Sequence, residues 1–269
     1  MTDPILAEAR DTTRRVARTF ALACRLLPRG VRDDVYRLYL VYRTLDDLVD
    51  ERSPEALGRV AAVEDWCHGG ANGATTPETA LLAQLAERHP IPPDALREFC
   101  AGMRFDLAGG ENRTEEDLDL YCYRVAGTVG LTMAAMLGAR GEEAERRATA
   151  LGMAMQRTNV LRDIDEDLLT GRVFLATETI EAFGGSLAPG ERAELLRDQI
   201  ARADALYDEG MGGVALLPCG RRAVAAAGVM YREILRQIER EGYGERAGRA
   251  VVPAQRKLVV AARRVALSR

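Results

Sequence analysis

Apolar residues recur at helical spacing along almost the whole chain, and the sustained apolar–polar alternation that is typical of strands is missing from the sequence. Segments rich in glycine or proline interrupt the pattern at several points. We therefore predict an all-α, single-domain multi-helix bundle over residues 1–269, with a site built between facing helices. Helices are expected near residues 4–26, 31–51, 55–68, 77–88, 93–107, 115–137, 141–169, 189–210, 219–241 and 245–267.

Composition narrows the class of protein. Apolar residues make up 47% of the chain, and a net charge of −4 arises from interspersed acidic and basic residues, which argues against nucleic-acid binding. The five scattered cysteines form no CxxC pair, so neither a disulfide framework nor a zinc site is expected. Residues 1–15 lack the apolar core of a signal peptide, and no run of 18 apolar residues could span a membrane. We expect a cytoplasmic protein, with peripheral contact to a membrane surface left open.

The first candidate site lies in segment 42–51, within a strongly apolar helical pattern. Arg43, Asp46 and Asp50 are spaced three and four residues apart and share one helix face. Two carboxylates one turn apart repel each other, and a cation between them would remove that cost. Mg²⁺ is commonly held by one or two carboxylates plus substrate phosphates, and Arg43 could hold a diphosphate oxygen or orient a carboxylate. A solvated acidic face is the alternative interpretation.

The second candidate site repeats this arrangement. Gln156, Asn159, Asp163 and Asp167 form one continuous polar stripe on the predicted helix 141–169, with the carboxylates at its C-terminal end. A solvated face would normally mix lysine with glutamate, so amides and carboxylates at these positions favour a lined cavity.

A third segment, 121–130, lies between the two acidic stripes and carries Gly127 and Gly130 inside a helical pattern. Each glycine costs about 1 kcal/mol in a helix relative to alanine. Such glycines mark either a kink around a ligand or tight packing of two helices, and their spacing alone does not separate these alternatives.

Together these segments resemble the squalene/phytoene synthase family over roughly residues 10–265. RTLDDLVDE at 43–51 is similar to the family's first DxxxD motif, YCYRVAGTVG at 121–130 to its central motif, and Gln156 with TNVLRDIDED at 158–167 to its second DxxxD motif. Gly171-Arg172, Thr19-Phe20, the LLP of 26–28, Tyr231 and Arg256 also fit. The resemblance implies the class I isoprenoid synthase type of bundle, with a central cavity.

The resemblance also implies an activity, namely magnesium-dependent head-to-head (1–1′) condensation of two farnesyl or geranylgeranyl diphosphates. The reaction would pass through a cyclopropylcarbinyl diphosphate to phytoene or a squalene-type hydrocarbon, and NADPH would be needed only for a reduced product. Two or three Mg²⁺ ions are expected with diphosphate bound. The implied metal ligands are Asp46, Asp50, Asn159, Asp163 and Asp167.

Further roles follow from the same resemblance. Tyr121 would stabilise a cation or assist proton transfer, and the pocket would be lined by Thr19, Phe20 and Tyr39. The implied diphosphate- or metal-binding residues are Arg43, Gln156, Asn159, Arg162, Tyr231 and Arg256.

Some features leave the substrate and product open. Ala176 stands where the family usually has proline, and Asn112-Arg113 where it has an aromatic residue. Cys24 follows Phe20 by one turn, and a small residue there would leave room for a longer tail, which favours a C40 product.

Three other functions are weighed against this one. A di-iron bundle is disfavoured because His68 and His89 lack Glu-x-x-His partners. A class I terpene cyclase acting on a single diphosphate shares the ionisation step. A non-catalytic assembly factor would be expected to lose motif aspartates, and all four are present. The oligomeric state is not indicated.

Overall fold

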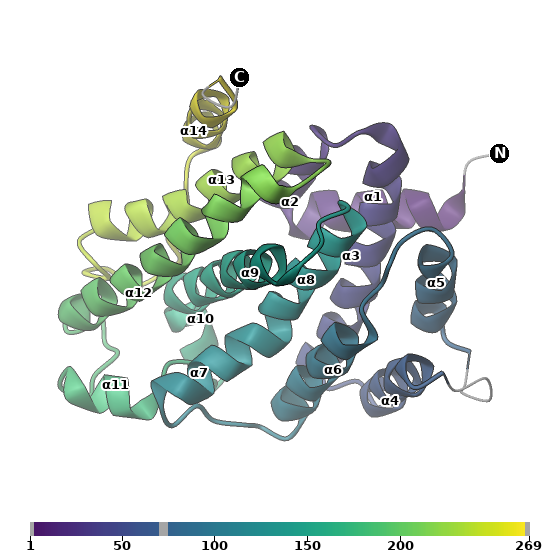
Figure 1. Ribbon diagram of the computed structural model, residues 1–269. Helices are drawn as coiled ribbons and strands as arrows, with labels where there is room; N and C mark the ends of the chain where they lie inside the picture. The colour runs from purple at the N-terminus through teal and green to yellow at the C-terminus, as the bar shows by residue number, and fades with distance from the viewer. Residues whose placement is uncertain (1–2, 70–74, 267–269) are drawn as a thin grey trace.

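The computed structural model describes residues 3–69 and 75–266, and every regular element in these ranges is a helix, as predicted (Figure 1). No helix in this described part is long and apolar enough to cross a membrane. The elements are α1 (Pro4–Val16), α2 (Arg18–Cys24), α3 (Arg29–Asp50), α4 (Ala56–Cys67), α5 (Pro77–Ala86), α6 (Pro93–Leu107), α7 (Glu115–Cys122), the π-helical turn η1 (Tyr123–Gly127), α8 (Thr128–Met136), α9 (Glu142–Arg162), α10 (Ile164–Leu169), α11 (Thr177–Ala182), α12 (Ala193–Gly212), the 3₁₀ turn η2 (Gly213–Leu216), α13 (Arg221–Arg240) and α14 (Ala254–Ala266).

Three predicted helices were wrong in their extent. The helix expected over 4–26 breaks at Ala17, which leaves helical geometry with φ −124° and ψ 57°. The helix expected over 141–169 breaks at Asp163, so the second polar stripe spans α9 and α10. The last helix begins at Ala254 rather than 245, because Gly244 and Gly248 adopt positive φ and Pro253 precedes the first turn. The short helix α11 was missed.

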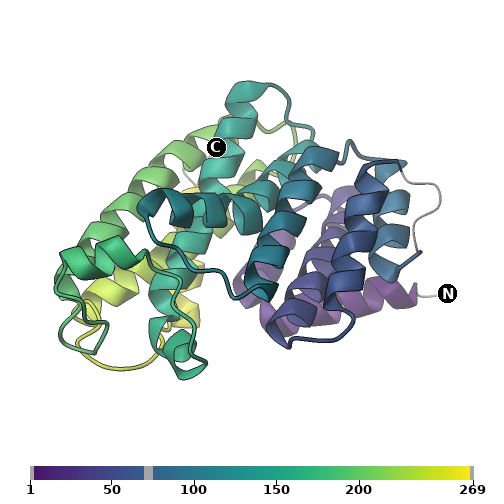
Figure 2. The same ribbon diagram turned by 90° about the horizontal axis from the view of Figure 1, so that it is seen from below.

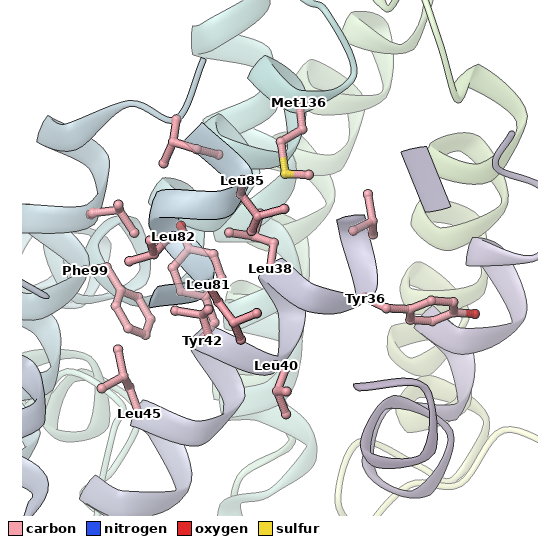
Figure 3. Close-up of a cluster of buried hydrophobic side chains, with 14 of the residues drawn as sticks. Tyr36, Leu38, Leu40, Tyr42, Leu45, Leu81, Leu82, Leu85, Phe99 and Met136 are labelled. Carbon is pink, nitrogen blue, oxygen red and sulfur yellow. The ribbon is translucent and has the colours of Figure 1, made fainter. Parts of the chain in front are cut away.

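Two hydrophobic clusters hold the helices together. In the first, α3 packs against α5, α6 and α8, and Figure 3 shows side chains from these helices meeting around Leu38 and Tyr42. The Tyr42 hydroxyl donates a 2.8 Å hydrogen bond to Thr132 Oγ1. The second cluster joins α9 to α7, α12 and α13, and Val125 of η1 packs against both clusters. Viewed from below, the N-terminal helices lie on one side and the green C-terminal helices on the other (Figure 2).

The backbones of α8 and α9 approach closely through glycine. A Cβ atom on Gly130 would lie 2.3 Å from the Ala148 carbonyl oxygen. A Cβ on Gly152 would lie 2.2 Å from the Ala126 carbonyl oxygen, so both positions need glycine. The packing interpretation of the central glycines is thus confirmed for Gly130. This contact sets the position of the segment that follows Tyr121 relative to the polar stripe of α9.

Candidate active site

The C-terminal half of α3 presents the first predicted set of residues. Arg43 donates a 3.0 Å hydrogen bond to Asp46 Oδ2 and also bonds Asp47. The buried Nε of Arg43 has no protein partner among the described residues. Burial by the surrounding helices and the neighbouring Asp50 carboxylate raise the pKa of Asp46 to about 7, although 42% of its side chain is exposed at the mouth of the site. This carboxylate therefore lies where a cation would stabilise its charged form.

Asp50, the second carboxylate of α3, is held by an arginine from a distant segment. Arg172, just after α10, donates hydrogen bonds of 2.7 Å to Asp50 Oδ1 and 2.8 Å to Asp106 Oδ1. Burial raises the pKa of Asp106 to about 6, against the opposing effects of Arg172 and a hydrogen bond from Tyr121. One guanidinium thus joins carboxylates of α3 and α6, in the geometry to which its planar fork is suited.

The polar stripe of α9 forms the opposite side of the site. Asn159 donates a 3.1 Å hydrogen bond to Gln156 Oε1 and accepts one of 3.1 Å from the Tyr231 hydroxyl. Arg162 donates to both carboxylate oxygens of Asp163, from Nε at 2.7 Å and from one Nη at 2.6 Å. The structure therefore brings Gln156, Asn159, Arg162 and Asp163 into one cluster with Tyr231 of α13.

Asp167 connects the two acidic helices electrostatically. Burial and the Asp163 carboxylate raise the pKa of Asp167 to about 6, and Asp50 adds to this effect. Asp50 lies on α3 and Asp167 on α10, so the C-terminal ends of the two predicted acidic stripes lie close enough for their charges to interact. Repulsion across this gap is offset by Arg172, which lowers the pKa of Asp167.

The apolar side of the site is built around Tyr121 and the two phenylalanine rings that contact it. The Tyr121 side chain is 6% exposed, its ring stacks on Phe174 at 5.3 Å and contacts Phe105 at 5.7 Å, and its hydroxyl donates a 3.2 Å hydrogen bond to Asp106. Burial and the Asp106 charge raise the pKa of Tyr121 well above its ordinary value, so the phenol stays protonated at neutral pH. A cavity of about 260 Å³ beside it is lined by Phe105, Glu111, Arg113, Asp117, Leu120, Tyr121 and Arg124.

The predicted pocket residues of α2 and α3 lie together on another wall. The rings of Phe20 and Tyr39 are 5.1 Å apart, and Thr19 is 8% exposed. Burial raises the pKa of Tyr39, and the nearby Tyr231 and Asp46 add to the shift, while Arg43 opposes it. Tyr39 is therefore near both the first aspartate set and Tyr231 of α13.

One predicted residue lies apart from the others. Arg256 donates a 2.9 Å hydrogen bond to Gln237 and lies 4.0 Å from the Glu233 carboxylate, and it contacts none of the motif aspartates. Two other basic residues of the C-terminal segment, Arg249 and Lys257, contact predicted site residues instead. Arg249 pairs with Asp163 at 3.0 Å, and Lys257 donates a 3.0 Å hydrogen bond to Thr19. Burial lowers the pKa of Lys257, and the nearby Arg162 and Arg249 add to this effect.

Sequence reasoning thus missed four residues of the site, namely Asp106, Arg172, Arg249 and Lys257. Arg172 was noted only as part of a motif, and Asp106 stands alone on its predicted helix without a periodic partner. Arg249 follows three glycines with positive φ, which no helical pattern could place.

The donor set suits magnesium in the presence of diphosphate. Asp46, Asp50, Asp163 and Asp167 offer carboxylate oxygens, the hard ligands that Mg²⁺ prefers. Within residues 3–69 and 75–266, no three acidic, histidine or cysteine side chains converge closely enough to hold a metal without other ligands. Arginines are paired with three of these four carboxylates, and the raised pKa values of Asp46 and Asp167 reflect charge that a cation would stabilise. The residues fit a metal that shares its coordination with substrate phosphates.

Comparisons with known proteins agree on one family. The family model described as squalene/phytoene synthase matches residues 13–256. The chain is 38% identical to the phytoene synthase of Thermus thermophilus over 248 residues, which cover 88% of this chain and 84% of that protein. It is 34% identical to the phytoene synthase of Arthrospira platensis over 276 residues, covering 93% and 89%.

Comparison with solved structures indicates the same family. A dehydrosqualene synthase in complex with a ligand superposes with a TM-score of 0.88 at 27% identity, covering 98% of this chain and 96% of that one. A squalene synthase from Alicyclobacillus acidocaldarius superposes with a TM-score of 0.78 at 28% identity, covering 89% and 95%.

Proposed function

Because this chain belongs to the squalene/phytoene synthase family and is an enzyme of the prenyltransferase type, we propose that it condenses two geranylgeranyl diphosphates head to head to phytoene, with magnesium as its cofactor. Farnesyl diphosphate is the second substrate to be tested. The observation that supports the proposal most directly is the apposition of Asp46 and Asp50 on α3 with Asp163 and Asp167 across the site, each set accompanied by arginine.

Diphosphate binding is the role of the charged half of the site. The carboxylates of Asp46, Asp50, Asp163 and Asp167, with the Asn159 amide, would hold Mg²⁺. When bound, the metal supplies Lewis-acid assistance to departure of the diphosphate. Arg172 bonds carboxylates and would exchange them for phosphate oxygens, which match its fork equally well. The same exchange is open to the other arginines of the site, which are Arg43, Arg162 and Arg249.

The apolar half of the site handles the cations that ionisation produces. The face of an aromatic ring attracts positive charge, and Tyr121, Phe174 and Phe105 present such rings next to Asp106. The Tyr121 hydroxyl keeps its proton and bonds Asp106, so this pair can take part in proton transfer at the hydroxyl oxygen. Tyr121 is only 6% exposed, which limits the access of water to a carbocation next to its ring.

Geranylgeranyl tails are favoured over farnesyl by two observations. The first is that relatives at 38% and 34% identity are named phytoene synthases. The second is that Cys24 is a small, buried residue one turn after Phe20, packed in the α3 cluster. A thiol occupies less volume than an aromatic or long aliphatic side chain, which leaves depth for a longer prenyl chain. Loss of a proton completes the route to phytoene, so no NADPH is required.

The proposal is tested by incubating the purified protein with Mg²⁺ and labelled geranylgeranyl or farnesyl diphosphate, with and without NADPH, followed by mass spectrometry of extracts. We expect a C40 hydrocarbon from geranylgeranyl diphosphate, in an amount that NADPH does not change. A C30 product alone would reassign the substrate, and a cyclic or short-chain alcohol would indicate a cyclase. Absence of diphosphate release from either substrate would overturn the enzymatic proposal.

A further inference from the structure

One carboxylate of the second acidic segment is engaged with the protein itself. Asp165 lies on α10 between the motif aspartates Asp163 and Asp167, and off the stripe that those two share. Its side chain is 17% exposed, and both of its oxygens accept hydrogen bonds from protein groups. Asp165 is therefore bound within the fold rather than left free for a metal.

Arg192, the residue before α12, forms a bidentate ion pair with this carboxylate. Its Nη1 donates to Asp165 Oδ1 at 2.6 Å, and its Nη2 donates to Asp165 Oδ2 at 2.7 Å. Nη1 also donates a 2.9 Å hydrogen bond to the Leu187 carbonyl oxygen. Arg192 is only 3% exposed, so its charge depends on this carboxylate rather than on water. A paired fork of this kind fixes the orientation of the carboxylate as well as its position.

The same carboxylate holds the main chain that leads to Arg249. The Gly248 N–H donates a 2.7 Å hydrogen bond to Asp165 Oδ2. The next residue, Arg249, pairs with Asp163 at 3.0 Å and with Glu166 at 3.3 Å. Asp165 thus fixes the backbone directly before the arginine that reaches the site.

The connection from α13 to α14 is also anchored on α12 (Figure 1). It contains no helix or strand, so individual contacts set its path. A Cβ atom on Gly244 would lie 2.5 Å from Arg192 Nε, and the Gly244 carbonyl oxygen accepts a 2.9 Å hydrogen bond from the Gly190 N–H. The Arg197 guanidinium lies 4.4 Å from the centre of the Tyr243 ring. Main chain therefore packs directly on the same arginine that clamps Asp165.

We infer that Asp165 and Arg192 are positioning residues, which act on the diphosphate through Arg249. The Arg249 side chain is 41% exposed and starts from an irregular segment, so ordering it on a phosphate costs conformational entropy. Fixing the Gly248 amide places the Arg249 backbone before substrate arrives, which lowers that cost. This inference rests on the proposed function, in which Arg249 contacts the diphosphate.

The test is a double-mutant cycle on diphosphate affinity. Calorimetry measures binding of inorganic diphosphate with Mg²⁺ to the full chain, and steady-state kinetics give KM and kcat for the prenyl diphosphate. We expect Asp165→Asn to weaken diphosphate binding and to raise KM about fivefold, with kcat changed less than about twofold. In the Arg249→Gln background the same substitution should change both affinities by less than about twofold, because the two residues act as one unit.

Asp204→Asn is the matched control. The Asp204 side chain is 20% exposed and also bonds two guanidinium groups, but these belong to Arg232 and Arg236 of α13. Its substitution should leave diphosphate binding unchanged. Arg192→Lys is a second variant for the same role, because lysine keeps the charge but cannot form the fork. It should weaken diphosphate binding as Asp165→Asn does, and both variants should speed hydrogen exchange at the Gly248 amide.

Several outcomes would overturn the inference. One is a full fivefold effect of Asp165→Asn in the Arg249→Gln background, which would show that Asp165 acts through α10 and its aspartates. Another is wild-type diphosphate affinity in Asp165→Asn and Arg192→Lys, with both proteins shown to be folded by circular dichroism. A wild-type chain that binds no diphosphate would contradict the proposed function as well, so the two failures are separate results.

Discussion

Arg172 and Asp50 form an ion pair of 2.7 Å although 122 positions separate them in the sequence. The pair joins the segment after the second aspartate motif to the end of the first one. Because Arg172 also holds Asp106, a single side chain neutralises carboxylates from two helices. The two acidic sides of the site are thus held together by arginine.

Replacing Arg172 should therefore impair turnover without unfolding the protein. For Arg172→Gln we expect kcat/KM to fall about 10- to 100-fold, as for the loss of a charge-assisted hydrogen bond. Arg172→Lys should recover only part of this loss, because an ammonium group cannot bond two partners in a fork. Steady-state kinetics at saturating Mg²⁺ measure the effect, and wild-type kinetics in Arg172→Gln would contradict it.

The motif aspartates should be indispensable. We expect Asp46→Ala and Asp163→Ala each to lower turnover at least about 1,000-fold, because several kcal/mol of charge stabilisation at the leaving diphosphate would be lost. Product formation is measured, and circular dichroism should show unchanged helix content. Asp33→Ala serves as the control, since Asp33 also lies on α3 but pairs with Arg10 away from the site. Near-normal turnover in both site variants would refute their assignment to the metal.

The family resemblance and the structure assign the diphosphate contact near the C-terminus to different arginines. The resemblance implies Arg256, whereas in the structure Arg249 pairs with Asp163. We expect Arg249→Gln to raise KM for the prenyl diphosphate about tenfold, as for a lost contact to phosphate. Arg256→Gln should change it by no more than about twofold, because Arg256 faces Gln237. The reverse order of effects would show that the segment before α14 rearranges when substrate binds.

A buried polar network behind the site should make stability depend on pH. Arg157 is 3% exposed and bonds Glu115 at 2.8 Å and Asp119 at 2.6 Å, and Gln199 also donates to Glu115. Burial raises the pKa of Glu115, but hydrogen bonds from Thr179 and Arg157 outweigh it, so the pKa is lowered overall. A lowered folded-state pKa means stability that is present above the unfolded value of about 4.3 and lost as the pH falls through the folded value.

Glu115→Gln should accordingly lower the free energy of unfolding by about 2 kcal/mol at pH 7. The difference from wild type should shrink as the pH falls below about 4, where Glu115 becomes protonated in the wild type as well. Urea unfolding at both pH values measures this. Glu116→Gln removes the same charge from the neighbouring exposed position and should have little effect. A difference that grows toward low pH would have the wrong sign for this network.

The periodic parts of the molecule could be predicted from the sequence. Asp46 with Asp50, and Asn159 with Asp163, share faces because helical spacing places them so, and a polar stripe on a helix within the bundle needs a polar partner or a ligand. Asp106 and Arg249 could not be found in this way, since each enters the site alone. Arg256 was chosen on the family resemblance alone, whereas the positive φ values of Gly244 and Gly248 bend the chain before α14 and bring Arg249 to the site.

The close packing at Gly130 and Gly152 has a consequence for redesign. Gly130 of α8 packs on the Ala148 main chain of α9, and Gly152 of α9 packs on the Ala126 main chain of η1, so a larger residue at either position would push these segments apart. Libraries that aim at new product lengths should therefore leave both glycines unchanged. Diversity is better placed at Phe20 and Tyr39, which are partly buried and contact each other through their rings, with centroids 5.1 Å apart.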